Sequence, residues 1–320
     1  MLELLKTVHG AVSKRGISSI LSMVRLQKGL VIGTNGTVTI GARVEELSHL
    51  DVTTPADRFL KAMATADLSK LKIKHLDSGR LSVVAGKFRA FIPTEDNEHF
   101  PQIEPTGQLI ECSGLIEALR AVAPFMGDDA IRTWSNGVLL TNDYVYATNN
   151  VSLVRYKVDM TLPSIILPRV TVLELLRIAK EPMGTITDEH SVSFILDEDV
   201  WVKSSLIDGK WPDIEKFFED RNGMKPINPE LIKAVETIAP FCPDAGLPKI
   251  FFSSEGVRTD EGSTSSEYTD IELPVGCYHA DVLRTVLPLI DVVNWDRYPK
   301  ACPFEGSGGK LQGLMMGMVV

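Results

Sequence analysis

The residues of this chain that could do chemistry are scattered and do not combine into a catalytic pattern. The glycine-rich residues 306–309 could bind a phosphate, but no helix is expected to follow them as in a P-loop, so a hairpin turn fits better. Cys277 lies near His279, yet residues two apart rarely face each other, and the sequence indicates no third group to orient them. We therefore predict no catalytic residues and no enzymatic activity.

Metal ligands and cofactor motifs are equally sparse. The cysteines Cys112, Cys242, Cys277 and Cys302 are far apart and lack the Cys–Cys or Cys–His spacing of a zinc site. Acidic residues at 128–129 and 188–189 could hold a cation, but short acidic runs of this kind are usually solvated loops. We predict no metal and no cofactor, with free thiols in the reducing cytoplasm.

Composition places the chain among soluble globular proteins. It has 320 residues, of which 44% are hydrophobic and 23% are charged, and its formal net charge is −9. No stretch approaches the roughly 18 consecutive apolar residues of a membrane span, and the N-terminus does not resemble a signal peptide. Net negative charge disfavours a protein that simply coats nucleic acid, although an acidic protein binds DNA when its positive charge gathers on one surface.

Two short patterns recur along the chain. The segment Phe-Pro-Gln-Ile-Glu at residues 100–104 returns as Trp-Pro-Asp-Ile-Glu at residues 211–215, and residues 115–125 resemble residues 231–241. Because proline lacks an N–H group, each aromatic–proline pair should lead the chain out of a sheet. The two copies are 111 residues apart in the first pattern (211 − 100) and 116 in the second (231 − 115). Patterns that recur at nearly the same spacing indicate repeated domains. We predict three domains, over residues 1–107, 108–222 and 223–320.

Each predicted domain has two helices backed by antiparallel strands, so the chain is expected to be an α+β protein. Apolar residues three and four apart predict the helices, with Thr54 as the N-cap of the second, and alternating residues such as Val200 and Val202 predict strands. The helices are expected at residues 2–15, 55–66, 113–126, 169–180, 229–241 and 279–290. Together they carry a net charge of +4, which leaves −13 for the rest of the chain. Ordinary solvated helix faces are the alternative explanation of this contrast.

With these elements placed, the chain resembles the bacterial DNA polymerase sliding clamp, the beta clamp or DNA polymerase III subunit beta. The resemblance is collinear over the whole chain, and its domains look shorter than usual, as in a compact phage version. The segments that carry it best are residues 135–140, 146–148, 166–169 and 204–213.

The resemblance implies a fold and a function. Three repeated DNA-clamp domains form each chain, and two chains close head-to-tail into a homodimeric ring with helices inside and sheets outside. Such a ring encircles double-stranded DNA without base readout and tethers the DNA polymerase as a processivity factor, and a clamp loader is a further expected partner. The residues expected to face DNA are Lys6, Lys14, Arg15, Arg58, Lys61, Arg120, Arg169, Arg177, Lys180, Lys233 and Arg284.

The three-domain count predicts the dimer, because six domains need two chains. Edge strands with apolar neighbours invite pairing between chains. We predict an interface between the last strand of the first domain and the end of the first helix of the third. Its residues are Arg89, Ala90, Phe91, Ile92, Ala239, Pro240 and Phe241.

The C-terminus indicates a surface for partner peptides. Leu314, Met316 and Met318 alternate at the end of the chain, and methionine-rich surfaces adapt to several ligands, although a simple core strand is the alternative. The resemblance implies a cleft that this tail shares with Thr148, Asn150, Leu153, Pro212 and Phe217.

The chain departs from the family in that cleft. The family's Asp-Gly-x-Arg is here Asn-Asn-Val-Ser at residues 149–152, and its tail proline and arginine are Gly317 and Val319. A more apolar cleft that accepts a different peptide motif is expected.

Two other functions stay open on the sequence. One is a clamp-fold protein-binding hub that does not encircle DNA, which the weakly basic third domain favours. The other is an enzyme with a metal or nucleophile, which a turnover or metal assay would reveal.

Overall fold

The structure is a computed structural model that describes residues 1–13, 18–101, 103–243, 247–260 and 265–319. The chain forms two compact units: unit 1 contains residues 1–116 and 160–207, and unit 2 contains residues 117–159 and 208–320. The boundaries predicted at residues 107 and 222 remain a prediction. Lys14 and Arg15 lie outside the described residues.

Unit 1 is built on an antiparallel sheet that crosses the first predicted domain boundary. Its strands are β1 (Met23–Gln27), β2 (Leu30–Thr34), β3 (Val38–Arg43), β4 (Asp51–Pro55), β8 (Ile110–Glu111), β13 (Gly184–Thr187), β14 (Ser191–Ile195) and β15 (Val200–Ser205). They follow the order β4-β1-β2-β3-β15-β14-β13-β8. Ile40 of β3 lies opposite Val202 of β15, and both are buried. The β3–β15 pairing thus joins segments far apart in sequence into one sheet.

The predicted alternation in β15 is confirmed, because Val200, Val202 and Ser204 are all buried. Trp201 on the opposite face lies over Gly41, where an added Cβ would come within 2.2 Å of the indole ring. A glycine is therefore required at this position for the tryptophan to cross the strand pair.

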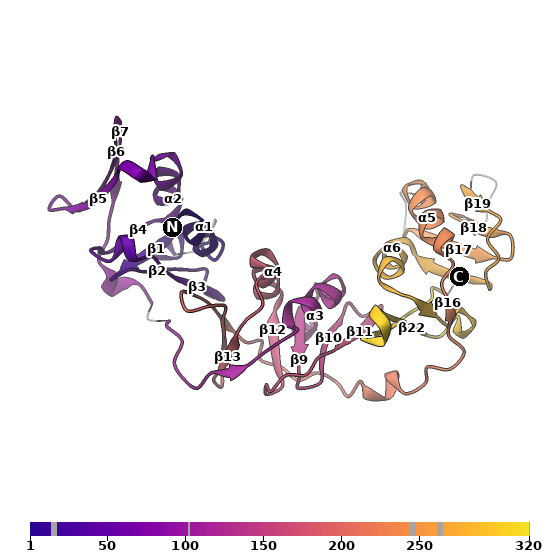
Figure 1. Ribbon diagram of the computed structural model, residues 1–320. Coiled ribbons are helices and arrows are strands. Elements are labelled where there is room, and N and C mark those ends of the chain that lie inside the picture. Colours follow the sequence, from indigo (N-terminus) through magenta and orange to yellow (C-terminus); the bar gives the residue numbers. More distant parts are fainter. Residues whose placement is uncertain (14–17, 102, 244–246, 261–264, 320) are drawn as a thin grey trace. The chain divides into compact units, whose positions relative to one another are not determined.

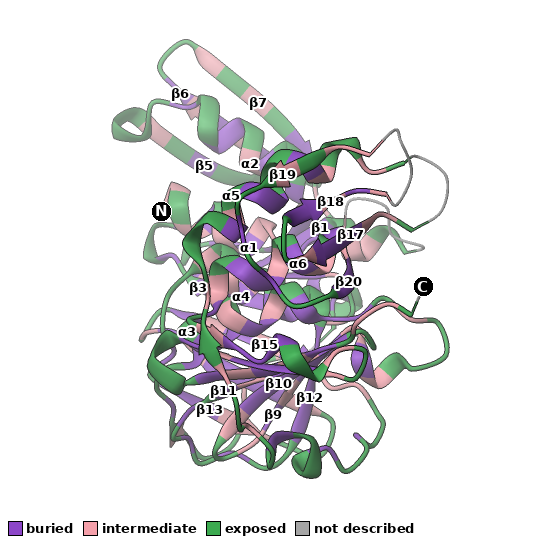
Figure 2. Cartoon of the chain, turned by 90° about the vertical axis from the view of Figure 1, so that its right-hand side faces the viewer, coloured by how far each residue is buried: buried purple, intermediate pink, exposed green. Residues whose placement is uncertain are grey.

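A second, smaller sheet of unit 1 has an open edge. Its strands are β5 (Leu71–Leu76), β6 (Arg80–Ala85) and β7 (Phe88–Pro93). β6 lies between the other two, so among the described strands β7 forms a sheet ladder with β6 alone. Figure 2 shows exposed and half-buried residues along most of β7.

The helices of unit 1 pack as amphipathic elements, and their bounds are α1 (Leu2–His9), α2 (Ala56–Thr65) and α4 (Arg169–Ile178). α1 and α2 lie side by side (Figure 1), and the His9 Nε2 atom is 2.6 Å from an Asp57 carboxylate oxygen. The prediction that the first helix extends to residue 15 is wrong, because α1 ends at His9 and is followed by Gly10, a poor helix former.

The N-cap predicted for the second helix is also wrong. Thr54 belongs to strand β4, and its hydroxyl donates to the Pro93 carbonyl oxygen instead of to the helix. Pro55 occupies the cap position without a side-chain hydrogen bond. Its fixed φ makes it suitable for leading a strand into a helix.

Unit 2 has the same construction. Its strands β9 (Gly137–Leu140), β10 (Tyr144–Thr148), β11 (Ser152–Lys157), β23 (Leu311–Met315), β22 (Cys302–Gly306), β21 (Val292–Val293) and β16 (Lys225–Pro226) follow one another in that order in an antiparallel sheet. Leu153 of β11 lies opposite Leu314 of β23. The β11–β23 pairing therefore repeats the role of β3–β15, because it joins two segments about as far apart in sequence.

The other sheet of unit 2 contains β17 (Lys249–Ser253), β18 (Gly256–Arg258), β19 (Glu267–Thr269) and β20 (Gly276–His279), in the order β19-β18-β17-β20. Helices α5 (Pro229–Ile238) and α6 (Ala280–Val286) pack against each other. α3 (Leu115–Val122) spans the boundary between the units, and β12 (Ile165–Pro168) precedes α4.

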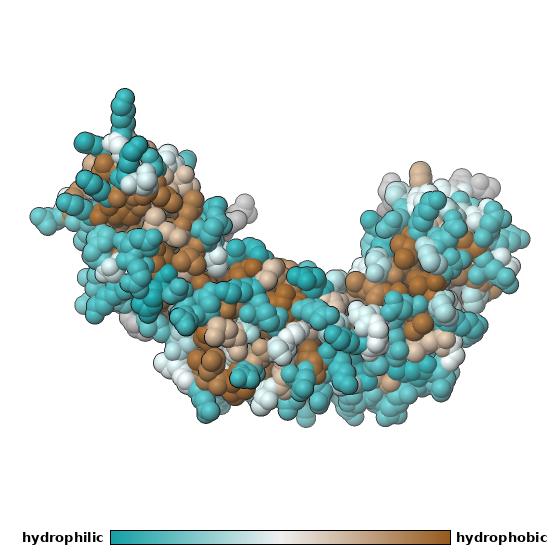
Figure 3. Space-filling view, in the orientation of Figure 1, coloured by the Kyte–Doolittle hydropathy of each residue, from teal (hydrophilic) through white to brown (hydrophobic). Residues whose placement is uncertain are grey.

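The fold class predicted from the sequence, α+β with antiparallel sheets, is confirmed. On the face shown in Figure 3, hydrophilic residues cover most of the surface and apolar residues form separate patches. No helix in the described part of the chain is long and apolar enough to cross a membrane.

Candidate functional site

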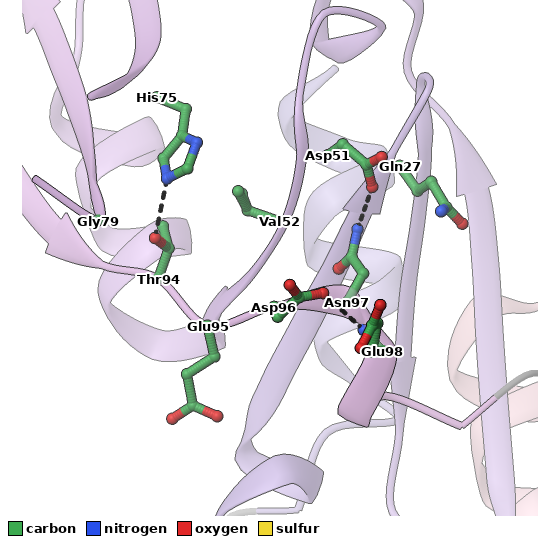
Figure 4. A pocket seen from close by; sticks show the side chains of 10 residues that line it. All are labelled: Gln27, Asp51, Val52, His75, Gly79, Thr94, Glu95, Asp96, Asn97 and Glu98. Atoms are coloured by element: carbon green, nitrogen blue, oxygen red, sulfur yellow. Dashed lines mark hydrogen bonds between the residues drawn. The ribbon is translucent and has the colours of Figure 1, made fainter. Parts of the chain in front are cut away.

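A polar cavity in unit 1 is the first place to look for chemistry (Figure 4). It has a volume of about 550 Å³ and is lined mainly by acidic and amide side chains, together with His75. Its polar groups bond to each other: Asn97 donates to the Asp51 carboxylate, and the Thr53 hydroxyl donates to Asn97 over 2.7 Å. His75 lies 3.1 Å from the Thr94 hydroxyl, and no carboxylate of the described residues bonds to it. The cavity contains none of the predicted site residues.

Metal ligands are not gathered either. Within the residues that the structure describes, no group of three or more His, Cys, Asp or Glu side chains is arranged to hold a metal ion. The thiol of Cys112 is buried beside the Met160 sulfur, and burial raises the pKa of Cys112 to about 12. Such a thiol stays protonated and unreactive at neutral pH.

Several of the cations predicted to face DNA are engaged in local pairs. Lys6 lies 2.7 Å from Glu3, Arg284 lies 3.6 Å from Asp281, and Lys180 bonds to Asp197. Because each partner is a carboxylate, these residues add little net charge to their surroundings.

Arg177 has a structural role of its own. It donates to Glu174 over 2.8 Å and to the Thr7 carbonyl oxygen over 2.9 Å. Thr7 is in the last turn of α1, whose final carbonyl groups lack helical partners. Arg177 therefore ties α4 to the end of α1 within unit 1.

The remaining predicted cations are more available. Arg58 and Lys61 on α2, Arg120 on α3 and Lys233 on α5 are exposed, and no ion pair within the described residues involves them. Arg169 is exposed at the first position of α4. The four side chains of Arg58, Lys61, Arg120 and Lys233 are the strongest candidates for contact with a polyanion.

The turn between β10 and β11 presents three of the residues predicted to contact partner peptides. Asn150 has a φ of 69°, in the left-handed region that asparagine tolerates. Its side-chain oxygen accepts a hydrogen bond of 2.6 Å from Arg132. The Thr148 hydroxyl donates to the Ser152 carbonyl oxygen over 2.7 Å. Leu153, the third, follows in β11.

The C-terminal tail is held beside this turn by main-chain bonds. The Met316 N–H donates to the Val151 carbonyl oxygen over 2.9 Å, and the Met318 N–H donates to the Cys277 carbonyl oxygen over 2.7 Å. The Tyr298 hydroxyl donates to the Met318 carbonyl oxygen over 2.8 Å. Met316 is 45% exposed and Met318 is half-buried. The tail therefore contributes accessible methionine to a fixed surface.

Residues 211–218, here called the strap, form the other side of this surface. The strap ends in a short 3-10 helix, η7 (Glu215–Phe218), which packs against β23. Phe217 is 50% exposed, whereas Trp211 is buried and donates its indole N–H to the Trp134 carbonyl oxygen over 3.1 Å. Pro212 is exposed near the start of the strap.

The structure brings together most of the predicted peptide-contact residues. Leu153 and Leu314 are paired across β11 and β23, Met316 continues from them, and η7 packs on the same strand. We call the surface formed by Leu153, Phe217, Leu314, Met316 and Met318 the peptide surface.

Sequence reasoning missed the side chains that hold the strap in place. The Tyr146 hydroxyl donates to Glu215 over 2.6 Å, and Arg155 donates to the other Glu215 oxygen over 2.7 Å. Burial and the bond to Glu215 raise the pKa of the Tyr146 hydroxyl, which therefore stays a donor at neutral pH. Glu215 is the last residue of the recurring aromatic–proline pattern, whose two copies, residues 100–104 and 211–215, are here called the first and second exit segments. This recurrence was the one sign in the sequence that Glu215 has a role.

The residues predicted for the subunit interface are split between surface and core. Phe91 on β7 is 57% exposed and Phe241, in the 3-10 helix η8 (Ala239–Phe241), is 64% exposed. Arg89 and Pro240 are exposed, and Ala90 and Ala239 are half-buried. Ile92 is only 2% exposed and points into unit 1, so a charge introduced there would disrupt the core instead of testing an interface.

Comparison with known proteins points to one family. No protein-family model matches the chain. The curated beta sliding clamp of Pseudomonas putida strain KT2440 is 26% identical over 242 residues, which cover 68% of this chain and 65% of that protein. The matched part of the chain therefore spans slightly less than two thirds of that relative's length.

Solved structures with the same fold cover the whole chain. The DNA polymerase III subunit beta from Pseudomonas aeruginosa has a TM-score of 0.81 and 19% identity, and the DNA polymerase sliding clamp from Bacillus subtilis has 0.84 and 14%. A sliding clamp from Bartonella birtlesii bound to griselimycin has a TM-score of 0.84 and 18% identity. Each match covers 100% of this chain and 97% of the other. The resemblance predicted from the sequence is thus confirmed: the chain has the fold of the bacterial beta sliding clamps throughout and is related to one of them in sequence.

Proposed function

We propose that this chain is a DNA sliding clamp: two copies close into a ring around duplex DNA and tether a DNA polymerase. The observation that carries the proposal is a strand pairing that occurs twice. In each case the last strand of one three-strand run pairs with the last strand of the run three places further along the chain, as β3 pairs with β15 and β11 pairs with β23. β19 ends the fifth run, and counting three runs on into a second copy gives β7 of that copy as its partner.

The two small sheets that carry these open edges differ in charge. The residues around β5 to β7 carry the exposed cations Lys70, Lys72, Lys74, Arg80, Lys87 and Arg89. The residues around β18 and β19 carry the exposed carboxylates Glu255, Glu267, Asp270 and Glu272. Opposite charges favour pairing of unlike edges, and like charges disfavour pairing of two identical edges. Head-to-tail closure follows from this asymmetry.

The helices supply contacts of the kind that a clamp needs. Arg58, Lys61, Arg120, Arg169 and Lys233 are exposed and lie on helices, where flexible cations contact phosphates without reading bases. Because phosphate neutralisation releases counterions, binding to linear DNA should be weak and should weaken further as salt rises.

The peptide surface is the proposed docking site of the polymerase and the clamp loader. Its fixed methionine tail and exposed Phe217 suit short apolar peptide segments. Griselimycin, which the Bartonella birtlesii clamp binds, is a defined probe for it. A non-catalytic role in the cytoplasm accords with this reading.

Ring closure has a direct test in sedimentation. Wild-type protein should sediment at about twice the 35.2 kDa chain mass, and Phe91→Asp or Phe241→Asp should give monomers because each puts a charge on a predicted edge contact. Phe217→Asp is the matched control, since Phe217 is an exposed aromatic residue outside these edges. A dimer that survives both edge substitutions would contradict the proposed closure.

A clamp-fold hub that does not encircle DNA remains the second candidate. It is favoured by α5 and α6, where Glu230 and Glu236 outnumber Lys233, and Arg284 pairs with Asp281. Loading onto nicked circular DNA separates the two functions. A ring stays on the circle and leaves after the DNA is cut, whereas a hub shows no difference between circular and linear DNA.

A further inference from the structure

We propose that Arg155 and Glu215 are positioning residues of the peptide surface. They fix the strap so that Phe217 is already held beside β23 before a partner binds. The proposal rests on the proposed function, because it assigns a role in binding at the same surface. The strap has no regular structure from residue 211 to residue 214. A segment of this kind is held only by its side-chain contacts and a few turns.

Arg155 contacts the strap and the sheet at the same time. Its guanidinium lies 4.2 Å from the centre of the Tyr144 ring and 4.3 Å from the centre of the Phe218 ring. Its Nε–H donates to the Gln312 side chain over 2.9 Å, and an Nη1–H donates to Glu215 over 2.7 Å. A planar guanidinium can stack on two rings with its faces and, at the same time, donate hydrogen bonds to two acceptors from its edge, which a lysine ammonium cannot do. Arg155 is 11% exposed, so its ring contacts are shielded from water, whereas the Glu215 carboxylate is 59% exposed.

Glu215 completes the attachment from the strap side. One carboxylate oxygen accepts from Arg155 and the other accepts from the Tyr146 hydroxyl over 2.6 Å. The Tyr146 ring also contacts Trp211 and Phe218, at centroid distances of 6.4 and 6.3 Å. Both ends of the strap are therefore held against β10 and β11.

Phe217 depends on these contacts without making them. It lies between Glu215 and Phe218 within η7, and its N–H donates to the Ile214 carbonyl oxygen. Because Arg155 holds Glu215 and Phe218, which lie on either side of Phe217, the backbone at Phe217 is fixed as well. A surface that is already ordered loses less entropy when a ligand binds, so release of the strap should weaken binding without removing any contact residue.

The first exit segment, residues 100–104, supplies a matched control. Glu104 pairs with Arg25 over 2.6 Å, as Glu215 pairs with Arg155, but Glu104 belongs to unit 1, whereas the residues of the peptide surface belong to unit 2. Glu104→Gln therefore changes the same chemistry in the equivalent repeat.

The test compares Arg155→Lys, Glu215→Gln and Glu104→Gln in the full chain, with griselimycin titrated by calorimetry and amide exchange followed over the strap. We expect Arg155→Lys and Glu215→Gln to bind about tenfold more weakly, because only a fraction of molecules holds the competent strap. Exchange in residues 211–218 should accelerate in both variants. Glu104→Gln should match the wild type in both measurements.

A double-mutant cycle separates positioning from a general loss of structure. If Arg155 acts through Phe217, then Phe217→Ala should cost much less affinity in the Arg155→Lys background than in the wild type. Additive losses would overturn the proposal, as would unchanged strap exchange in Arg155→Lys. If the wild type itself fails to bind griselimycin, the proposed peptide surface is contradicted, and amide exchange still decides whether Arg155 holds the strap.

Discussion

The two exit segments of the chain share one residue pattern but are attached to their sheets by different contacts. In each, an aromatic residue is buried before a proline, and a glutamate three residues after the proline bonds to an arginine of the sheet. Arg25, in unit 1, is completely buried and lies 5.8 Å from the centre of the Phe100 ring. Arg155, in unit 2, is slightly exposed and is stacked between two rings.

The two attachments differ in the surroundings of their ion pairs. In the first, the arginine of the ion pair is completely buried, whereas in the second the arginine also stacks on two rings and donates to Gln312. Loss of a single partner should therefore affect the two attachments unequally. The following changes test that difference, beginning with the largest.

Trp211→Ala should have the largest effect on stability. Removal of a buried aromatic side chain costs about 3–5 kcal/mol of unfolding free energy. Trp211 also contacts the Trp134 ring at 5.0 Å and the Tyr146 ring, so its loss should exceed that of Phe100→Ala. Urea unfolding followed by circular dichroism measures both variants. An equal or larger loss in Phe100→Ala would show that the second attachment has no additional aromatic support.

Glu104→Ala should cost about 2–3 kcal/mol, since it leaves the buried guanidinium of Arg25 without this charged partner. Glu215→Ala should cost less, because Arg155 keeps both rings and its bond to Gln312. The same unfolding experiment ranks them, with Glu104→Gln as the control that keeps a hydrogen-bond acceptor. The reverse ranking would show that the first attachment does not depend on its glutamate more strongly than the second does.

Tyr146→Phe should cost about 1 kcal/mol, the net value of a typical hydrogen bond. The change removes only the hydroxyl that donates to Glu215, and Glu215 is half-exposed, so water replaces the lost donor. Tyr144→Phe is the control, since no hydrogen bond among the described residues involves the Tyr144 hydroxyl. A loss of several kcal/mol would mean that the second attachment depends on one bond after all.

The smallest effect should be a pH dependence at the end of the second exit segment. Backbone hydrogen bonding from Asn222 and an ion pair with Arg297 hold the pKa of Asp220 below its usual 3.8. A lowered pKa means stability that is present above pH 3.8 and is lost as pH falls through the folded-state value. Wild type should therefore exceed Asp220→Asn in thermal stability at pH 7, and the gap should close in strong acid. A gap that stays constant down to pH 2 would exclude the ion pair as its cause.

The repeat itself was predictable, because aromatic, proline and glutamate residues keep their spacing on the sequence. The arginines were not, since Arg25 and Arg155 lie 79 and 60 residues before their glutamates. Only the folded sheet brings such distant residues together. The α+β class followed in the same way from local patterns, whereas the pairing of β3 with β15 did not.

Local patterns also failed where neighbouring residues share one character. Phe91 and Ile92 are both apolar and were both expected in the interface, but the first faces solvent and the second the core. Thr54 has the side chain of a good N-cap, but its hydroxyl bonds across to Pro93. In both cases a tertiary contact decided between two locally acceptable arrangements.

In the proposed ring, the open edges of β7 and β19 would make the chain a bifunctional building block, in the sense that polymer chemistry gives the term. A unit with two complementary ends forms closed rings if successive steps rotate back to the start, and open fibres if they do not. Once two chains have joined at one end, the second joining occurs within a single particle and no longer depends on protein concentration. A substitution that bends the sheet where β3 meets β15 or β11 meets β23 would leave both ends intact. Such a variant should grow into filaments, whereas a variant that blocks an edge should stop as a monomer.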